Sequence, residues 1–443
     1  MNFMKKIWAS GVSEDSLPYL NRLMVYDDID ADRHLVDYEV LTLTAYHLQI
    51  MKQGIIPQHE SIQILHALWE IYASSPDLDA DLEDVHGNIE AMVLELAGDS
   101  GKNLRLFLSR NEQIQTDILL FTRDHLLKVA LKCAATAEVI TARREKVMGV
   151  MPGFTHYRQG MVISPVTYLD YMASIFFFRA KKILDVFKAN ETLPLGYGSG
   201  FGSLSGVNFQ AVAAYLGLKK GDVNPMYEAS HRGIDELNSI FELSLLMLDI
   251  SRISQDFILM SGDEMPVFSL PTGFTTGSSL MANKRNPDFL EMIQGYAAEI
   301  AGRMTGGLMT LISKSSGYHR DFQIIKKNLM DSFLRVEDIL DASAHFFAGV
   351  EFNREKSCSI VQNSSFATSN AQRLFLNGKT WKDSYAAVGE MLKSGQRLDE
   401  IAPEEIRSID SEMIRELKSE IISIRDTMEK HYTDIMAEAH SKQ

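Results

Sequence analysis

The feature of this sequence that most constrains its fold is a long helical run without a breaker. From residue 112 up to Gly149 the chain contains no proline and no glycine. Apolar side chains recur there at steps of three and four, the spacing of an amphipathic helix: Leu126, Val129, Cys133, Ala137 and Ile140. A helix over about 112–148 would be about 50 Å long at 1.5 Å per residue. The run therefore predicts one member of a long helix bundle.

Two further stretches share this periodicity. Over residues 235–261 the apolar positions repeat about every 3.5 residues, as in the seam of a bundle. Another helix is expected over about 287–313. Its glycines indicate close approach of neighbouring helices, because each costs about 1 kcal/mol relative to alanine in a helix interior: Gly295, Gly302, Gly306 and Gly307.

We therefore expect an all-α protein with a long central helix bundle and smaller helical domains at both ends. The expected limits are 1–104 for a mainly helical N-terminal domain, 105–349 for the bundle and 350–443 for a small C-terminal domain. The tail up to Gln443 has the charged composition of a solvated amphipathic helix.

Composition limits the kinds of partner that the protein can bind and the cell compartment in which we expect it. The chain has 44 basic and 59 acidic residues and a net charge of −15, which argues against a nucleic acid partner because phosphate binding needs a basic face. The first residues lack the apolar run of a signal peptide, and no stretch approaches the roughly 18 apolar residues of a membrane span. The two cysteines give neither a disulfide framework nor a metal-ligand spacing. We expect a cytoplasmic protein without membrane association.

A glycine-rich segment at 195–206 does not indicate a dinucleotide site. Gly196 and Gly198 would need a third glycine at position 201, which is Phe201. No βαβ pattern surrounds the segment, so the fingerprint of a nucleotide-binding turn is absent from the sequence.

Residues 277–288 combine small polar side chains with a helix start. Asn286 is suited to cap the helix, Pro287 to its first position and Asp288 to its first turn. Backbone N–H groups at a helix start bind anions, and Lys284 adds a full positive charge. From the residues alone, the stretch is either an anion site or an ordinary flexible loop before a well-capped helix.

This stretch resembles the signature of the fumarase/aspartase superfamily, with Gly-Ser-Ser, methionine, lysine, asparagine and proline at matching spacings. Ala282 stands where that family usually has proline. Further blocks follow in the family's order: 81–90, 109–113, 155–156, 194–196 and 318–326. The Ser-Arg-Asn block and the set of Tyr318, Gln323 and Lys326 are most similar to the argininosuccinate lyase branch.

The resemblance implies β-elimination of argininosuccinate to arginine and fumarate, a small-molecule reaction that needs no metal and no cofactor. Ser278 is then the candidate base, and Lys284 neutralises the charge that develops on the substrate. His156, in a loop fixed by Pro152 and Gly153, is the candidate proton donor or shuttle, and Glu291 is its acidic partner. The side chains expected to bind the substrate are Asn111, Thr155, Asn286, Tyr318, Gln323, Lys326, Arg110, Arg232 and His86.

The resemblance also implies an assembly. Members of this family form homotetramers around a shared helix bundle, and each active site is built from three subunits. If that arrangement carries over to this chain, a monomer has no complete site.

Departures from the branch keep other functions open. Residues 105–108 replace a His-Thr-Gly-Arg run, and Asp28 stands where the family has a substrate-contacting serine. His231 and Gly233 replace two aspartates, and Glu112 replaces another. The alternatives are another fumarate-releasing lyase, such as an adenylosuccinate-type enzyme, and a helical scaffold without activity, because fold does not fix function.

Overall fold

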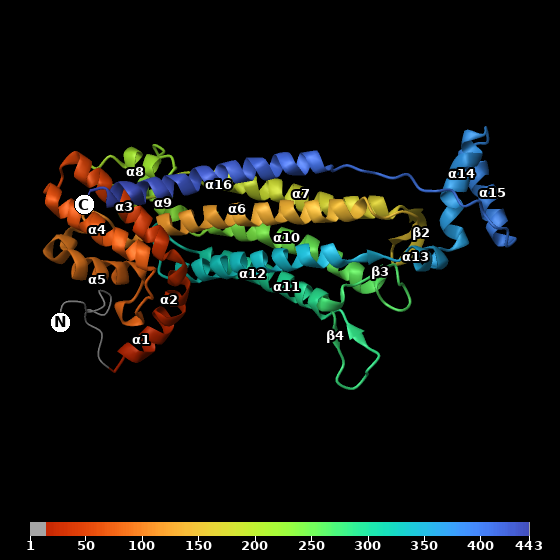
Figure 1. The fold of residues 1–443 in the computed structure, drawn as a ribbon, viewed down its shortest axis with the longest axis horizontal. Helices are drawn as coiled ribbons and strands as arrows, with labels where there is room; N and C mark the ends of the chain where they lie inside the picture. Colours follow the sequence, from red (N-terminus) through yellow and green to blue (C-terminus); the bar gives the residue numbers. More distant parts are fainter. Residues whose placement is uncertain (1–14, 443) are drawn as a thin grey trace.

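The computed structural model describes residues 15–442. The chain forms an elongated bundle whose long axis is set by its longest helices (Figure 1). These are α6 (Arg110–Arg144), α7 (Pro165–Ala189), α10 (Ile234–Met260), α11 (Asp288–Leu311), α12 (Phe322–Gly349) and α16 (Ser411–His440). The predicted all-α fold class is confirmed. In the described part of the chain, β structure is limited to three two-stranded sheets and one isolated bridge between Thr192 and Lys219.

Helix α6 runs along the centre of the bundle. Its apolar stripe is fully buried, including Cys133, Ala137 and Ile140. The helix ends at Arg144, short of the expected residue 148. Buried Arg144 pairs with Asp170 of α7 and donates to the Ile409 carbonyl oxygen at 2.7 Å, and these contacts hold the chain where it leaves the helix.

The N-terminal segments form a layer across one end of the bundle, at the left of Figure 1. Gly54, in the left-handed conformation at φ 64°, ends the buried helix α3. The segments of the layer are α1 (Leu17–Met24), α2 (Tyr26–Asp32), η2 (Arg33–Leu35), α3 (Val36–Gln53), α4 (Gln58–Ser74), η3 (Ala80–Leu82), α5 (Val85–Ala97) and η4 (Gly98–Asn103).

Short strands and helices connect the long helices. Strand β1 (Met151–Thr155) pairs with β2 (Arg158–Ile163) at the far end of the bundle, and β4 (Thr276–Gly277) pairs with β5 (Arg285–Asn286) in a hairpin that projects sideways (Figure 1). The remaining connections are η5 (Gly198–Gly200), α8 (Phe209–Tyr215), α9 (Pro225–His231), η6 (Thr272–Phe274) and the pair of β3 (Phe268–Ser269) with β6 (Glu351–Phe352).

The C-terminal segments divide between the two ends of the molecule. Segments α13 (Arg354–Ile360), η7 (Asn363–Phe366), α14 (Ala367–Leu376) and α15 (Trp381–Lys393) lie at the far end, and the last three share a small separate core. Helix α16 then returns along the bundle to α3 and α4. The expectation of a solvated tail is wrong for one face of this helix, because its apolar stripe is buried: Ile414, Leu417, Ile421, Met428 and Ile435.

The glycines of α11 do not share one role. A Cβ atom at Gly307 would lie 2.4 Å from Cδ2 of Leu237, so glycine permits close contact between α11 and α10 there. A Cβ atom at Gly295, Gly302 or Gly306 would meet nothing within 4 Å. Close helix approach therefore explains only Gly307 within this chain.

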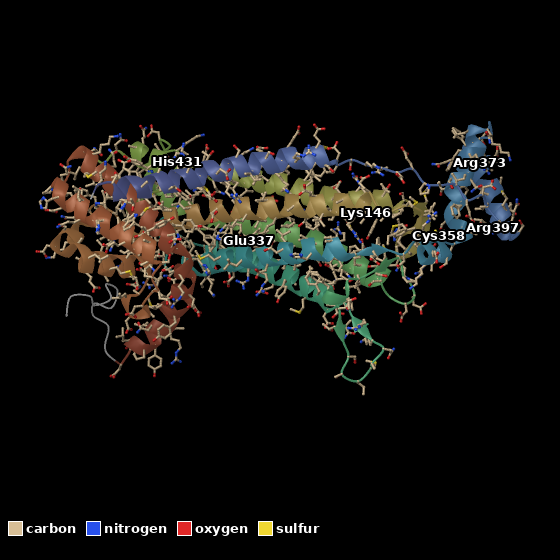
Figure 2. All side chains as sticks on the ribbon, in the orientation of Figure 1. Lys146, Glu337, Cys358, Arg373, Arg397 and His431 are labelled. Atoms are coloured by element: carbon tan, nitrogen blue, oxygen red, sulfur yellow. The ribbon has the colours of Figure 1, made fainter. Side chains whose placement is uncertain are left out.

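Two further properties bear on the class of protein. No helix in residues 15–442 is both long and apolar enough to cross a bilayer. Cys133 is buried in α6, whereas Cys358 is exposed on α13 at the far end of the molecule (Figure 2), and both are free thiols.

Candidate active site

Seven of the predicted substrate-binding residues line one pocket at the N-terminal end of the bundle. The cavity has a volume of about 150 Å³ and lies among α2, α5 and the first turns of α6 and α12. The predicted residues that it brings together are His86, Arg110, Asn111, Arg232, Tyr318, Gln323 and Lys326.

The start of α6 positions Arg110 and Asn111. The Ser109 hydroxyl accepts a hydrogen bond from the Asn111 N–H at 3.2 Å, and the Glu112 carboxylate accepts one from the Ser109 N–H at 2.8 Å. This reciprocal capping box fixes the first turn. Glu112 also accepts from the N–H groups of Gly196 at 2.7 Å and Gly198 at 3.0 Å. The buried carboxylate thereby joins the helix start to the glycine-rich segment.

Arg110 is held by two carboxylates before α5. Its guanidinium lies 3.1 Å from a Glu83 oxygen and 3.0 Å from an Asp84 oxygen. Asp84 caps α5 by accepting from the Gly87 N–H. Burial opposes its charge, but neighbouring His86 and Arg110 lower the pKa of Asp84 below its ordinary value. Arg110 is therefore a paired charge that orders the pocket wall.

Arg232 has a different environment. The residue is only 2% exposed, and its guanidinium lies over the Tyr318 ring at 4.9 Å from the ring centroid. Among residues 15–442, no hydrogen-bond acceptor reaches any of its three side-chain nitrogens. A cation–π contact stabilises such a charge, but it does not replace the lost water. Arg232 is thus a buried cation that an anionic ligand can satisfy.

Lys326 lies between two carboxylates of α2. Its ammonium is 2.6 Å from an Asp28 oxygen and also pairs with Asp32. Burial disfavours its charge, yet Asp32 and Asp28 raise the pKa of Lys326. Burial, together with neighbouring Asp32, raises the pKa of Asp28 despite the attraction of Lys326. Gln323 donates to the other Asp28 oxygen.

A buried charge network lies behind this pocket. His86 Nδ1 is 3.0 Å from a Glu39 oxygen and 3.9 Å from an Asp117 oxygen. Burial opposes its charge, but the Glu39 carboxylate raises the pKa of His86. These three side chains are the one group in the described residues with ligand atoms close enough to hold a metal ion. A metal ligand must be a neutral imidazole, so a raised pKa favours an ion-paired histidine instead.

Thr155 and His156 lie at the opposite end of α6. They belong to the β1–β2 hairpin, which replaces the expected loop at Pro152 and Gly153. His156 and Tyr157 both have positive φ, at 53° and 56°, as the two-residue turn of such a hairpin requires. Residues other than glycine and asparagine are uncommon at these angles. The turn leaves the His156 side chain exposed at the tip.

Ser278, Lys284 and Asn286 belong to the projecting β4–β5 hairpin. The Ser278 hydroxyl oxygen accepts from the N–H groups of Leu280 at 3.3 Å and Met281 at 3.1 Å. The expected helix start is wrong in detail, because Asn286 lies in β5 and Pro287 precedes the first residue of α11. The donors to Ser278 therefore come from the loop and not from a helix N-terminus. Glu291 is exposed on the first turn of α11.

The predicted residues thus form three groups that do not meet within one chain. Helix α6 has 35 residues and spans about 52 Å, and it separates Asn111 from His156. The hairpin that carries Ser278 points away from the bundle on its side (Figure 1). A site that uses all three groups needs more than one copy of the chain.

Several pocket residues were not among the predicted ones. Asp32, Glu83, Asp84 and Arg320 also line the cavity. Three of them fall inside sequence blocks that resemble the family, so the blocks could have indicated them. Asp32 lies one helical turn after Asp28, outside these blocks. No pattern in the sequence indicated that it contacts Lys326, because the fold brings the two together.

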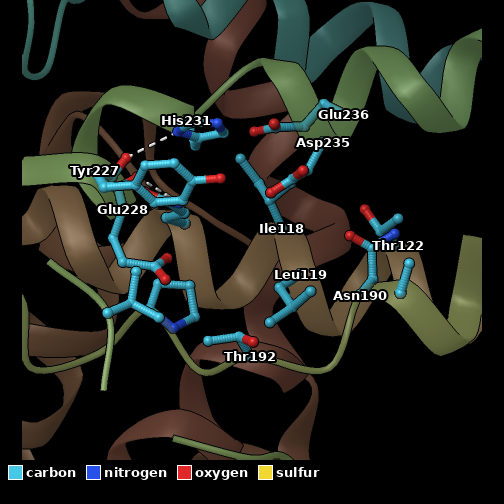
Figure 3. A pocket seen from close by; sticks show the side chains of 14 residues that line it. Ile118, Leu119, Thr122, Asn190, Thr192, Tyr227, Glu228, His231, Asp235 and Glu236 are labelled. Atoms are coloured by element: carbon cyan, nitrogen blue, oxygen red, sulfur yellow. Dashed lines mark hydrogen bonds between the residues drawn. The ribbon is translucent and has the colours of Figure 1, made fainter. Parts of the chain in front are cut away.

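A second cavity of about 210 Å³ lies beside the N-terminal third of α6, next to Ile118 and Thr122 (Figure 3). His231 stacks on Tyr227 there, with ring centroids 3.7 Å apart, and Asp235 and Glu236 also line the space. None of the predicted catalytic or substrate-binding residues lines it. The smaller pocket is therefore the candidate site.

The long helix bundle and its pocket of charged side chains suit an enzyme, and the comparisons with known proteins give its class as a lyase. A family model described as "Lyase" matches residues 21–302. The chain belongs to this lyase family, within the fumarase/aspartase superfamily.

Curated relatives agree over most of the chain. An argininosuccinate lyase of Xanthomonas campestris pv. campestris is 31% identical over 388 residues, which cover 86% of this chain and 89% of the relative. An argininosuccinate lyase of Thermotoga neapolitana is 28% identical over 400 residues, which cover 89% of this chain and 100% of the relative.

Solved structures share the fold at lower identity. The structure of EDDS lyase in complex with formate has a TM-score of 0.73 at 19% identity, and the match covers 92% of this chain and 87% of that one. Class II fumarase from Schistosoma mansoni has a TM-score of 0.68 at 18% identity, with 84% and 86% covered.

Proposed function

We propose that this protein is a carbon–nitrogen lyase that releases fumarate by β-elimination, with argininosuccinate as its reference substrate. The observation that carries the proposal is the buried Arg232 guanidinium, which lies in the pocket with Asn111 and Tyr318 and lacks a hydrogen-bond partner among the described residues. A buried guanidinium without hydrogen bonds keeps much of its desolvation cost, even with the buried Glu236 carboxylate close enough to attract it. A substrate carboxylate supplies the missing anion, and the names of the curated relatives support the choice of argininosuccinate.

In the proposed reaction, Ser278 takes a proton from the carbon next to a substrate carboxylate. Its oxygen already accepts hydrogen bonds from two backbone N–H groups. The same hydrogen bonds would stabilise the alkoxide that a serine base requires. Lys284 neutralises the charge that builds on that carboxylate. The carbon–nitrogen bond then breaks, the carbon–carbon double bond of fumarate forms, and the leaving nitrogen takes a proton from His156, which Glu291 orients.

The assembled enzyme is a homotetramer in this proposal, with each site shared between subunits. The separation of the three residue groups within one chain supports this arrangement, because no single copy completes a site. The outer face of α11 supports it too, since Met292, Leu308 and Met309 are about half exposed beside glycines with open space around them. We retain 105–349 as the bundle domain that assembles, with 1–104 at one end. Of the expected C-terminal domain 350–443, α14 and α15 lie apart from the bundle, whereas α16 packs along it.

A second candidate is a lyase of the same superfamily with a different amine. Asp28 favours it, because this carboxylate pairs with both Gln323 and Lys326, two of the residues expected to bind the substrate. Incubation with argininosuccinate, adenylosuccinate and aspartate, followed by fumarate absorbance, separates the candidates. A signal with only adenylosuccinate or aspartate would overturn the choice of argininosuccinate.

The role of Ser278 is tested by Ser278→Ala, with the neighbouring Ser279→Ala as control. We expect Ser278→Ala to lose turnover by about 10²- to 10⁴-fold, the range for removal of a general base. Its helical circular dichroism and its oligomer size should match those of the wild type. Loss of turnover without a change in structure would also show that the wild type is an enzyme and not an inactive scaffold. Unchanged turnover in Ser278→Ala, or an equal loss in Ser279→Ala, would remove Ser278 from this role.

A further inference from the structure

We propose that Asp28 makes one corner of the pocket a cation site, so that the enzyme prefers a leaving amine without a carboxylate at that end. The substrate class is a succinate joined to a basic amine, such as the counterpart of argininosuccinate that lacks its α-carboxylate. The proposal deepens the function proposed above and rests on it.

The donors in this corner already pair with carboxylates of the protein, and this pairing disfavours a substrate carboxylate there. Lys326 is 2% exposed, lies 2.6 Å from an Asp28 oxygen and pairs with Asp32 on its other side. Gln323, the neighbouring amide donor, gives its N–H to the second Asp28 oxygen. Both groups that could receive an anion are therefore occupied by α2.

The charges of this corner sum to an excess of negative charge. One ammonium lies between the two carboxylates of Asp28 and Asp32, and one Asp32 oxygen also accepts from the Val85 N–H at 3.0 Å. Glu83 and Asp84 line the same pocket, where Arg110 and Arg320 pair with them. A cationic group of the ligand is attracted to the Asp28 corner, and a carboxylate placed there is repelled.

The opposite charge lies elsewhere in the pocket. Arg232 is the buried cation without a hydrogen-bond acceptor in the described part of the chain, and it directly follows α9, away from α2. The pocket therefore carries opposite charges at two places. An anion can bind at Arg232, and a cation can bind at Asp28. A ligand that carries its carboxylates on the succinyl half and only basic groups on the amine half matches both sites.

The test compares kcat/KM for argininosuccinate and for its decarboxylated counterpart, measured with the full-length oligomer by fumarate absorbance. We expect the wild type to prefer the decarboxylated substrate by about tenfold or more. Asp28→Ser frees Gln323 and Lys326, so it should shift the ratio at least tenfold toward argininosuccinate, mainly through KM. Asp28→Asn, which keeps the size of the side chain, should shift it in the same direction.

The matched control is Asp30→Ser, because Asp30 lies on the same helix with its side chain 71% exposed and outside the pocket. This variant should keep the wild-type ratio. Wild-type preference for argininosuccinate, or a ratio that neither Asp28 variant changes, would overturn the role of Asp28 while fumarate release would still support the elimination. Absence of fumarate with both substrates would overturn the elimination itself and the proposal that rests on it.

Discussion

At the scale of single residues, the partner of a charged side chain decides what that side chain can do. Arg110, Arg232 and Lys326 all line the candidate site. Arg110 and Lys326 form close ion pairs with carboxylates, whereas Arg232 lies over an aromatic ring and makes no hydrogen bond within the described residues. Sequence motifs predicted that these residues gather. They could not predict the pairing, because Gln323 and its partner Asp28 are 295 positions apart.

His47 provides a prediction about stability and pH. It is fully buried in α3, contacts the Leu104 carbonyl oxygen at 2.8 Å, and burial lowers the pKa of His47 to about 4. A lowered pKa gives stability that is present above the ordinary value of about 6.5 and is lost as the pH falls toward 4. Between pH 7 and pH 4, the wild type should therefore lose about 3 kcal/mol through this group.

His47→Gln retains a donor but cannot titrate, so its free energy of unfolding should fall less over the same pH range. Urea unfolding of both proteins at pH 7, 5.5 and 4 measures the difference. Parallel losses in the two proteins would show that His47 does not take up a proton on unfolding.

At the scale of elements, the carboxylate of Glu112 joins the start of α6 to the glycine-rich segment. It accepts hydrogen bonds from the N–H groups of Ser109, Gly196 and Gly198. Hydrogen bonds to a charged group contribute more than neutral ones, so Glu112→Gln should lower the free energy of unfolding by about 2–3 kcal/mol. Amide hydrogen exchange at 196–198 should also become faster.

Glu138→Gln is the control on the same helix, because Glu138 is half exposed and its ion pair is with Lys418 on the surface. Such pairs contribute at most about 1 kcal/mol, so this variant should remain close to the wild type. Equal stability of the two variants would contradict the structural role of Glu112.

The elements differ in how far the sequence predicts them. Apolar periodicity predicted α6, α10 and α11 to within a few residues, because a long stripe averages over local exceptions. The β1–β2 hairpin was missed, since its turn has His156 and Tyr157 where such turns usually have asparagine and glycine. The buried face of α16 was missed because charged residues outnumber its narrow stripe of apolar side chains. The stripe became evident only from its packing against the bundle.

At the scale of the whole molecule, the three groups of predicted residues lie at separate places on an elongated bundle (Figure 1). The pocket with Asn111 is at one end, the turn with His156 is at the other, and Ser278 projects from the side. Which of these residues act in one site stays a prediction of the sequence blocks. The distance between the three groups follows from the lengths of the helices. The proposed reaction therefore requires several chains to assemble.

The most direct test of a site shared between chains is to combine two inactive variants. Ser278→Ala removes the proposed base, and Asn111→Ala alters the pocket at the start of α6. Each variant alone should release little fumarate at the size of the native oligomer. Oligomers assembled from an equal mixture should recover about a quarter of wild-type activity, because one site in four then takes both intact groups from different chains. Activity that never exceeds the sum of the two separate variants would contradict a site shared between subunits.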